Sequence, residues 1–181
     1  IFGGILCRRG LEQDIQQIEK YEIPEIDLVI VDLYPFEATV ASGADEAAII
    51  EKIDIGGISL IRAAAKNYND VVIVASQAQY KPLLDMLMEH GANSSLEERR
   101  WMAKEAFAVS SHYDSAIFNY FDAEEGSAFR QSANDQKMLR YGENPHQKGF
   151  FYGNLEAMFD QIHGKEISYN NLLDINAAVE L

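Results

Sequence analysis

The sequence predicts an α/β fold in which helices cover a mostly parallel sheet. Two apolar, β-branched runs, residues 26–33 and 71–75, have the composition of strands that are buried on both faces of such a sheet. Helical patterns lie between and after these runs, and this alternation is typical of α/β proteins. Residues 122–137 are polar, rich in small residues and without periodicity, which indicates a domain boundary.

The N-terminal part of the chain leads into the first strand. Residues 1–9 are apolar, then glycine-rich, then basic, and we expect a loop or a strand end there. Apolar residues recur at helical spacing over residues 11–21, and Pro24 closes that segment. Pro35 ends the strand that follows, because proline has no N–H group to donate to a strand ladder.

The remaining helices have clear start and stop signals. Pro82 suits the first turn of an amphipathic helix that stops at Gly91. Ser95 and Glu98 have the spacing of a capping box at the start of the longest helix. The predicted helices cover residues 44–53, 57–67, 80–90 and 95–121.

Composition excludes several classes of protein. Of the 181 residues, 48% are hydrophobic and 24% are charged, the balance of a globular chain that can bury a core. The net charge of −14 argues against a nucleic-acid partner, because phosphate backbones are bound by clustered Lys and Arg. The single cysteine, Cys7, fits a reducing compartment. We find neither a secretory signal nor a membrane-spanning apolar run, and expect a cytoplasmic protein without a membrane partner.

One segment before a predicted helix has the features of an anion site. Asp54, Ile55, Gly56 and Gly57 lead into that helix, so free backbone N–H groups and the positive end of its dipole can face a ligand. Alternatively, Asp54 only caps the helix. Lys66 ends the same helix, where it either complements the dipole or, if desolvated, exchanges protons near neutrality.

A second group of candidates lies where the first strand ends. Open α/β sheets bind ligands outside the carboxyl ends of their strands, which is where Asp32 and Tyr34 are predicted. The alternative for Tyr34 is that it fills the core. The histidines share no metal-ligand spacing, so no metal site is predicted.

A third group occupies residues 140–147, which read RYGENPHQ. A glycine and an Asn-Pro pair mark this span as a turn, and polar groups on a loop suggest a binding surface. Arg140 can bind a phosphate or carboxylate with two parallel hydrogen bonds, and Tyr141 offers a stacking face and a hydroxyl. The alternative is a surface turn with a buried tyrosine, in which His146 fixes the loop and carries no proton.

This third group resembles the start of the transformylase half in the bifunctional AICAR transformylase/IMP cyclohydrolase family of purine biosynthesis. Four further segments agree with the family in order, and the string IDIGG followed by RAAAKN is rare. They are IFGGIL at residues 1–6, DLYPF at 32–36, IDIGGISLIRAAAKN at 53–67 and SYNNLLD at 168–174.

The resemblance implies a division into three parts. Residues 1–122 correspond to the C-terminal part of the cyclohydrolase domain, with a methylglyoxal-synthase-like parallel sheet and flanking helices. Residues 123–137 form a linker, and residues 138–181 begin an α+β, cytidine-deaminase-like transformylase domain. The family's N-terminal phosphate-binding loop would precede residue 1, so we expect a fragment that is inactive alone.

The resemblance also implies the last two steps of IMP biosynthesis, a transferase and a hydrolase activity in one multifunctional enzyme. The first step transfers a formyl group from 10-formyltetrahydrofolate, a co-substrate, to AICAR. The second closes the ring of the product to IMP with loss of water, and needs no metal. Catalytic roles are implied for Lys66, Tyr34 and Asp54. Substrate contacts are implied for Val31, Asp32, Ile55, Gly56, Gly57, Arg140, Tyr141, His146 and Asn171.

The family forms homodimers, so self-association is expected of the intact protein. Two positions depart from the family: Asp32 replaces a frequent asparagine, and Phe2 replaces a frequent histidine. A different class of function is a non-catalytic α/β module that senses a phosphorylated metabolite. Convergence of Tyr34, Asp54 and Lys66 on one pocket would favour the enzyme over that module.

Overall fold

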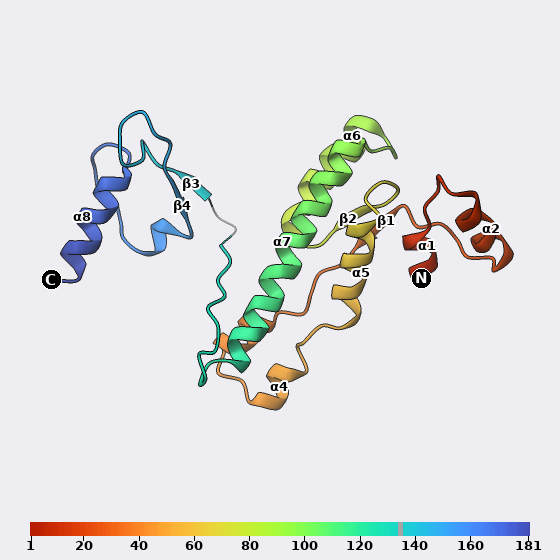
Figure 1. Ribbon diagram of the computed structural model, residues 1–181, viewed down its shortest axis with the longest axis horizontal. Helices are drawn as coiled ribbons and strands as arrows, with labels where there is room; N and C mark the ends of the chain where they lie inside the picture. The colour runs from red at the N-terminus through yellow and green to blue at the C-terminus, as the bar shows by residue number, and fades with distance from the viewer. Residues whose placement is uncertain (134–135) are drawn as a thin grey trace. The chain divides into compact units, whose positions relative to one another are not determined.

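The computed structural model describes residues 1–133 and 136–181 and is a mixed α/β structure (Figure 1). It divides into two compact units, Ile1–Arg130 (unit 1) and Gln131–Leu181 (unit 2). This division falls inside the predicted linker, residues 123–137, of which residues 134 and 135 lie outside the described part of the chain. The assignment of the units to the two domains of the resembled family stays a prediction.

Unit 1 is built on two parallel strands. The strand β1 (Leu28–Ile30) pairs with β2 (Val72–Val74), so that Leu28 lies opposite Val72 and Ile30 opposite Val74. The elements of unit 1 are, in chain order, α1 (Phe2–Leu6), α2 (Glu12–Lys20), β1 (Leu28–Ile30), α3 (Phe36–Ala41), α4 (Glu46–Ile50), α5 (Gly56–Lys66), β2 (Val72–Val74), the short 3-10 helix η1 (Gln77–Gln79), α6 (Tyr80–His90) and α7 (Leu96–Phe121).

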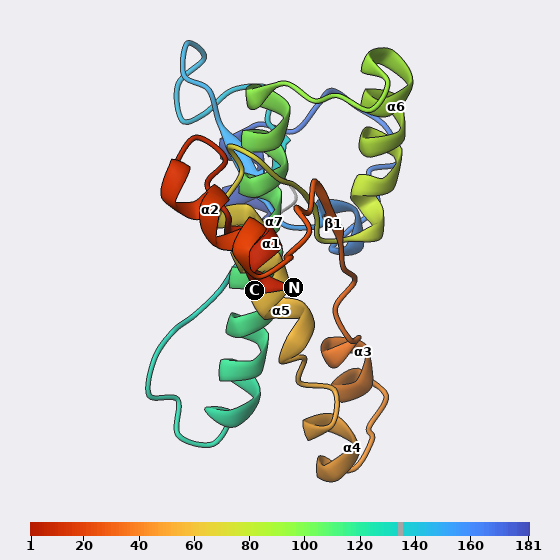
Figure 2. The ribbon, with the colours of Figure 1, turned by 90° about the vertical axis from the view of Figure 1, so that its right-hand side faces the viewer.

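Helices lie on both sides of this sheet. Figure 2 shows α6 on one side of the strands and α5 with α7 on the other. The core contains Ile61 and Ala64 of α5, Ile73 of β2 and Ala106 of α7, all fully buried. Small alanine side chains let α5 approach both the sheet and α7 closely. These contacts fix where both ends of α5 lie relative to the strands.

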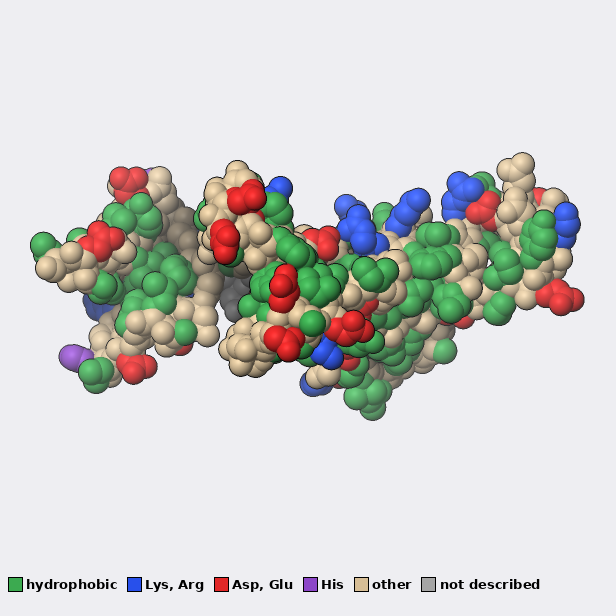
Figure 3. Space-filling view, turned by 90° about the horizontal axis from the view of Figure 1, so that it is seen from below, with side chains coloured by type: hydrophobic (Ala, Val, Ile, Leu, Met, Phe, Trp, Pro, Cys, Tyr) green, Lys and Arg blue, Asp and Glu red, His purple; other side chains and the backbone are tan. Residues whose placement is uncertain are grey.

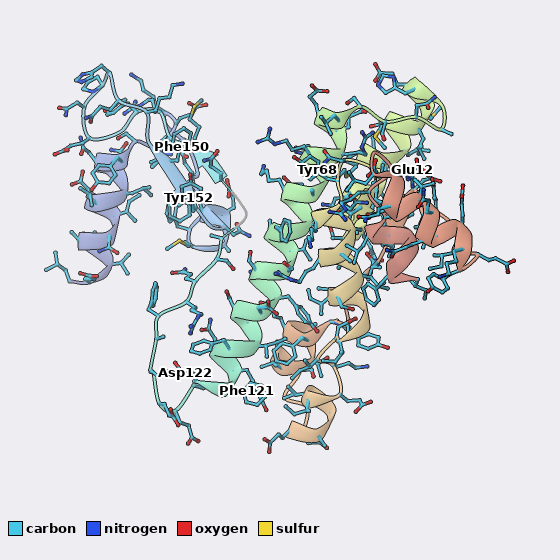
Figure 4. All side chains as sticks on the ribbon, turned by 45° about the vertical axis from the view of Figure 1, so that its right-hand side comes forward. Glu12, Tyr68, Phe121, Asp122, Phe150 and Tyr152 are labelled. Carbon is cyan, nitrogen blue, oxygen red and sulfur yellow. The ribbon has the colours of Figure 1, made fainter. Side chains whose placement is uncertain are left out.

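The predicted helices in the centre of the chain are confirmed. The helix α6 has the predicted bounds, and α7 begins at the predicted capping box. The Ser95 hydroxyl accepts a hydrogen bond from the Glu98 N–H group (3.1 Å), and the Glu98 carboxylate accepts one from the Ser95 N–H group (2.6 Å). In Figure 4 the labelled residues Phe121 and Asp122 mark the end of α7.

Two predictions for the N-terminal half are wrong. Residues 2–6 form a helix, α1, although the Gly-Gly pair suggested a loop. A Cβ atom on Gly4 would lie 2.2 Å from the Pro24 carbonyl oxygen, so tertiary packing requires this glycine. The first strand is shorter than residues 26–33 and is not buried on both faces. Leu28 and Ile30, which point to the same face of the sheet, are 38% and 49% exposed, whereas Val29 on the opposite face is buried, so one face of β1 is only partly covered.

Unit 2 is smaller and holds an antiparallel pair of strands. Its elements are β3 (Gln136–Met138), β4 (Phe150–Tyr152), the 3-10 helix η2 (Leu155–Ala157) and α8 (Tyr169–Val179). Figure 4 labels Phe150 and Tyr152 on β4, and both are exposed. Figure 3 shows hydrophobic side chains over much of the visible face of the protein. None of the described helices is long and apolar enough to cross a lipid bilayer.

Candidate functional site

The start of α5 is held by the carboxylate of Asp54. Its Oδ1 atom accepts hydrogen bonds from the N–H groups of Gly57 (2.6 Å) and Ile58 (3.2 Å), and the residue is buried. A Cβ atom on Gly57 would lie 2.8 and 2.9 Å from the two carboxylate oxygens, so only glycine fits there. Asp54 therefore caps the helix, and this contact occupies one of its oxygens.

The backbone leading into α5 is fixed by a tyrosine that the sequence did not single out. The Tyr113 hydroxyl, on α7, accepts a hydrogen bond from the Asp54 N–H group (2.9 Å) and donates one to the Lys52 carbonyl (2.7 Å). Burial raises the pKa of this hydroxyl, which keeps it protonated and able to donate. Only its place on the buried face of a helix hinted at Tyr113, and nothing in the sequence indicated its polar partners.

The end of β1 contacts the start of α5. The Val31 N–H group donates to the Val74 carbonyl (2.9 Å), and the Val31 side chain would lie 2.9 Å from a Cβ atom on Gly57. Ile55 is 75% exposed, and a Cβ atom on Gly56 would meet open space. Val31, Ile55 and the two glycines thus form one accessible corner, and their contact with a ligand stays a prediction.

Two exposed side chains extend this corner. Tyr34 is 55% exposed, so the alternative that it fills the core is wrong. The Lys52 ammonium lies 5.4 Å from the centre of the Tyr34 ring, within range of a cation–π contact. Asp32 accepts a hydrogen bond from the Tyr80 hydroxyl at the start of α6 (2.6 Å). Neither Lys52 nor Tyr80 was predicted as a site residue.

Lys66 lies away from this corner. It ends α5, whose 11 residues span about 16 Å, whereas Asp54 precedes the first residue of that helix. The exposed Lys66 side chain lines a different cavity of about 450 Å³, together with Leu6, Arg8, Asp14, Asn67 and Asn69. Within one copy of the chain, Tyr34 and Asp54 lie at one end of α5 and Lys66 at the other, so the three predicted catalytic residues do not share a pocket.

The Lys66 end of α5 is tied to the N-terminal segment. The Asn67 side-chain amide donates to the carbonyls of Ile5 and Cys7, both at 2.9 Å. Arg8 makes a two-pronged ion pair with Asp14 at 2.8 and 2.9 Å. Lys66 has no carboxylate partner in the described part of the chain. Burial raises the pKa of the Cys7 thiol, which makes a nucleophilic role unfavourable.

Unit 2 brings two predicted ligand contacts to one cavity. Arg140 and Asn171 both line a cavity of about 660 Å³. Two backbone hydrogen bonds join their segments: Arg140 N–H donates to the Ile167 carbonyl (2.9 Å), and Tyr169 N–H donates to the Tyr141 carbonyl (3.1 Å). The Asn171 Oδ1 atom caps α8 by accepting from Ser168, whose N–H group is 3.1 Å away.

Tyr141 and His146 differ in their surroundings. The Arg140 guanidinium lies 4.8 Å from the centre of the Tyr141 ring and donates to its hydroxyl (3.2 Å). A hydrogen bond with Ser168, and the Arg140 charge, lower the pKa of Tyr141. Tyr141 is half-buried, whereas His146 is exposed on the turn and is not among the described residues that line the cavity. No described group of three or more His, Cys, Asp or Glu residues could hold a metal ion.

Comparison with known proteins gives consistent results. The family model "AICARFT/IMPCHase bienzyme" matches residues 64–181. The bifunctional purine biosynthesis protein PurH of Bacteroides thetaiotaomicron is 93% identical over all 181 residues, and that of Rippkaea orientalis is 46% identical over 98% of the chain. The chain spans 36% and 37% of the lengths of these two relatives. The alignment with a crystal structure of ForH covers 68% of this chain and 64% of the ForH chain, with 33% sequence identity and a TM-score of 0.58.

Proposed function

We propose that the protein to which this chain belongs catalyses the last two steps of IMP biosynthesis, because the chain belongs to the AICARFT/IMPCHase bienzyme family. In the first step, the AICAR amine attacks the formyl carbon of 10-formyltetrahydrofolate and displaces the folate nitrogen. In the second, the carboxamide nitrogen attacks the new formyl carbon, and the formyl oxygen leaves as water with one proton from each of the two nitrogens. The protein would act as a homodimer in the cytoplasm, without nucleic acid or membrane partners.

Unit 2 supplies part of the transformylase site in this proposal. Arg140 and Asn171 line one cavity, and this is the observation that best supports the proposal. A guanidinium binds the phosphate of a nucleotide through parallel hydrogen bonds. Tyr141, whose hydroxyl lies 3.2 Å from Arg140, would add a stacking face for the AICAR ring. His146 would carry a proton only if the turn moved toward the bound ligand.

Unit 1 supplies part of the cyclohydrolase site. The accessible corner leaves the backbone of Gly56 open to the nucleotide, and the positive end of the α5 dipole would attract its phosphate. Val31 and the exposed Ile55 flank Gly56 there. Tyr34 would polarise the formyl carbonyl, and Asp54 would hold the helix start in place. Lys66 would act as the proton carrier of this step. Lys66 lies at the far end of α5 from Tyr34 and Asp54. In this proposal, residues from outside this copy of the described chain therefore complete the site in which Lys66 acts.

The proposal is tested in a chimera, the full-length Bacteroides thetaiotaomicron relative with its matching segment replaced by this chain. At 93% identity the replacement is conservative. Given AICAR and 10-formyltetrahydrofolate, the chimera is expected to form formylated AICAR and then IMP. Arg140→Ala is expected to slow the first step by at least about tenfold and to leave the second unchanged. Lys148→Ala, an exposed change outside the cavity, serves as the control.

A second candidate function is the sensing module, which binds a phosphorylated metabolite without turnover. The separation of Lys66 from Tyr34 and Asp54 favours it, because an enzyme needs its proton carrier near the reacting atoms. The same chimera decides between the two. Binding of inosine monophosphate without any formation of product from formylated AICAR would support the sensing module.

A further inference from the structure

A hydrogen bond joins the end of β1 to the start of α6. The Tyr80 hydroxyl donates to the Asp32 Oδ2 atom across 2.6 Å, between residues 48 positions apart in the chain. We propose that Tyr80 is a positioning residue, which orients the Asp32 carboxylate so that it selects the hydrogen-bond donors of a bound purine nucleotide. This inference rests on the proposed function only in placing the nucleotide at this end of the sheet.

The fold holds both partners from behind. Asp32 follows Val31, whose N–H group makes the last bond of the strand ladder, to Val74. Tyr80 follows Gln79, which is buried and accepts hydrogen bonds from the N–H groups of Ala75 (2.6 Å) and Ser76 (3.2 Å). The backbone is therefore fixed on each side of the pair, and the direction of the carboxylate is set before a ligand arrives.

The pair leaves one acceptor free. A separation of 2.6 Å is typical of a hydroxyl that donates to a carboxylate. This bond with Asp32 raises the pKa of Tyr80, so the hydroxyl keeps its proton at neutral pH. Among the described residues, Asp32 Oδ1 has no hydrogen-bond donor, and Asp32 has no Lys or Arg partner. Both residues are exposed at the carboxyl end of the sheet, so a ligand can reach them.

The charge of Asp32 limits what it can bind. An ionised carboxylate only accepts hydrogen bonds, so it attracts N–H and O–H groups and repels a phosphate. The phosphate must then lie elsewhere, and the pair must face another part of the nucleotide. A purine ribonucleotide offers two sources of donors, the ribose hydroxyls and the ring N–H group. Both satisfy the same acceptor, and ligand analogues separate them.

The experiment uses four variants of the chimera, Tyr80→Phe, Asp32→Ala, the double variant and Tyr21→Phe. Tyr21 is an exposed tyrosine after α2, with only a Lys20 contact to its ring in the described structure, so it is a matched control. Ring closure of formylated AICAR gives KM and kcat. Calorimetry gives the affinity for inosine monophosphate, for its 2′-deoxy form and for a purine ribotide without the ring N–H group.

Tyr80→Phe is expected to raise KM about 5- to 10-fold with little change in kcat, because a contact made equally in ground and transition states affects KM alone. Asp32→Ala is expected to raise KM at least as much, and the double variant no further, since the two residues act as one unit. Tyr21→Phe is expected to match the unmodified chimera. If Tyr80→Phe leaves the affinity for one of the analogues unchanged, the group missing from that analogue is the donor that binds Asp32.

Several outcomes would overturn the inference. Unchanged KM in Tyr80→Phe, or additive effects in the double variant, would show that the pair does not orient a ligand contact. A fall in the thermal midpoint of more than about 5 °C, without coupling to Asp32, would identify the bond as structural. If the chimera lacks turnover but binds inosine monophosphate, the proposed function fails. The coupling between Tyr80 and Asp32 is then measured from the affinities of the single and double variants for inosine monophosphate. If it does neither, both proposals fail.

Discussion

The hydroxyl of Tyr113 lies 2.9 Å from the backbone nitrogen of Asp54, and this contact joins α7 to the start of α5 across 59 positions of sequence. The same hydroxyl donates to the Lys52 carbonyl (2.7 Å). Asp54 in turn caps α5 through its carboxylate. One buried hydroxyl therefore holds the backbone on which the accessible corner around Gly56 is built.

Tyr113→Phe removes this hydroxyl and leaves the Asp54 N–H group buried without its partner. Loss of a buried partner costs about 1–3 kcal/mol. We expect the free energy of unfolding of unit 1 to fall by that amount in urea titrations, with little change in the slope. Tyr21→Phe, at an exposed tyrosine, is the control and is expected to have no effect. Equal stability of the two variants would contradict the role given to Tyr113.

The two glycines at the start of α5 are predicted to respond differently to alanine. A Cβ atom on Gly57 would lie within 2.9 Å of the Asp54 carboxylate and of Val31, whereas one on Gly56 would meet open space. Gly57→Ala should therefore destabilise unit 1 by about 1–3 kcal/mol, as overpacking does. Gly56→Ala should leave stability unchanged or slightly higher, because alanine favours helix.

Binding adds a second contrast between these glycines. If the Gly56 backbone touches the nucleotide, Gly56→Ala should weaken the binding of inosine monophosphate although the fold keeps its stability. Calorimetry with the folded variant measures this directly. Undiminished affinity in Gly56→Ala would place the nucleotide away from the start of α5.

The capping box of α7 predicts a stability change at acid pH. Hydrogen bonding to Ser95 lowers the pKa of Glu98 below its ordinary value of 4.5. A carboxyl group with a lowered folded-state pKa stabilises the protein above its unfolded-state pKa, and this contribution is lost as pH falls through the lower folded-state value. In Glu98→Gln the side-chain amide can still accept the capping hydrogen bond from Ser95, but it has no group that titrates. Its stability should depend less on pH below about 4.5 than that of the unmodified chain.

Much of this fold could be predicted, because its central helices carry local signals. The cap at Ser95 and the periodicity of α5 and α6 do not depend on distant partners. The helix α1 was missed because Gly4 resembles a helix breaker, and only its contact with Pro24 explains the glycine. The exposure of Leu28 and Ile30 on one face of β1 was missed because an apolar run does not reveal how completely each face of its strand is covered.

The candidate site was only partly predictable for the same reason. Arg140 and Asn171 were found through their motifs, and the structure places both at one cavity. Tyr80 binds Asp32 and Tyr113 binds Asp54, which lie 48 and 59 positions away in the chain. No local sequence pattern predicts contacts over such separations. The separation of Lys66 from Asp54 follows from helix length alone, since residues at opposite ends of α5 cannot meet within one copy.

The most direct test of the proposed function is the rate at which the chimera forms IMP from formylated AICAR, measured beside Lys66→Ala and Lys104→Ala. Lys104 is an exposed residue of α7, paired with Glu105, and serves as a charge-matched control. We predict that the chimera and Lys104→Ala form IMP at similar rates, and that folded Lys66→Ala is slower by about 100-fold or more. A chimera that binds inosine monophosphate but never forms it, or a Lys66→Ala variant with the full rate, would contradict this account.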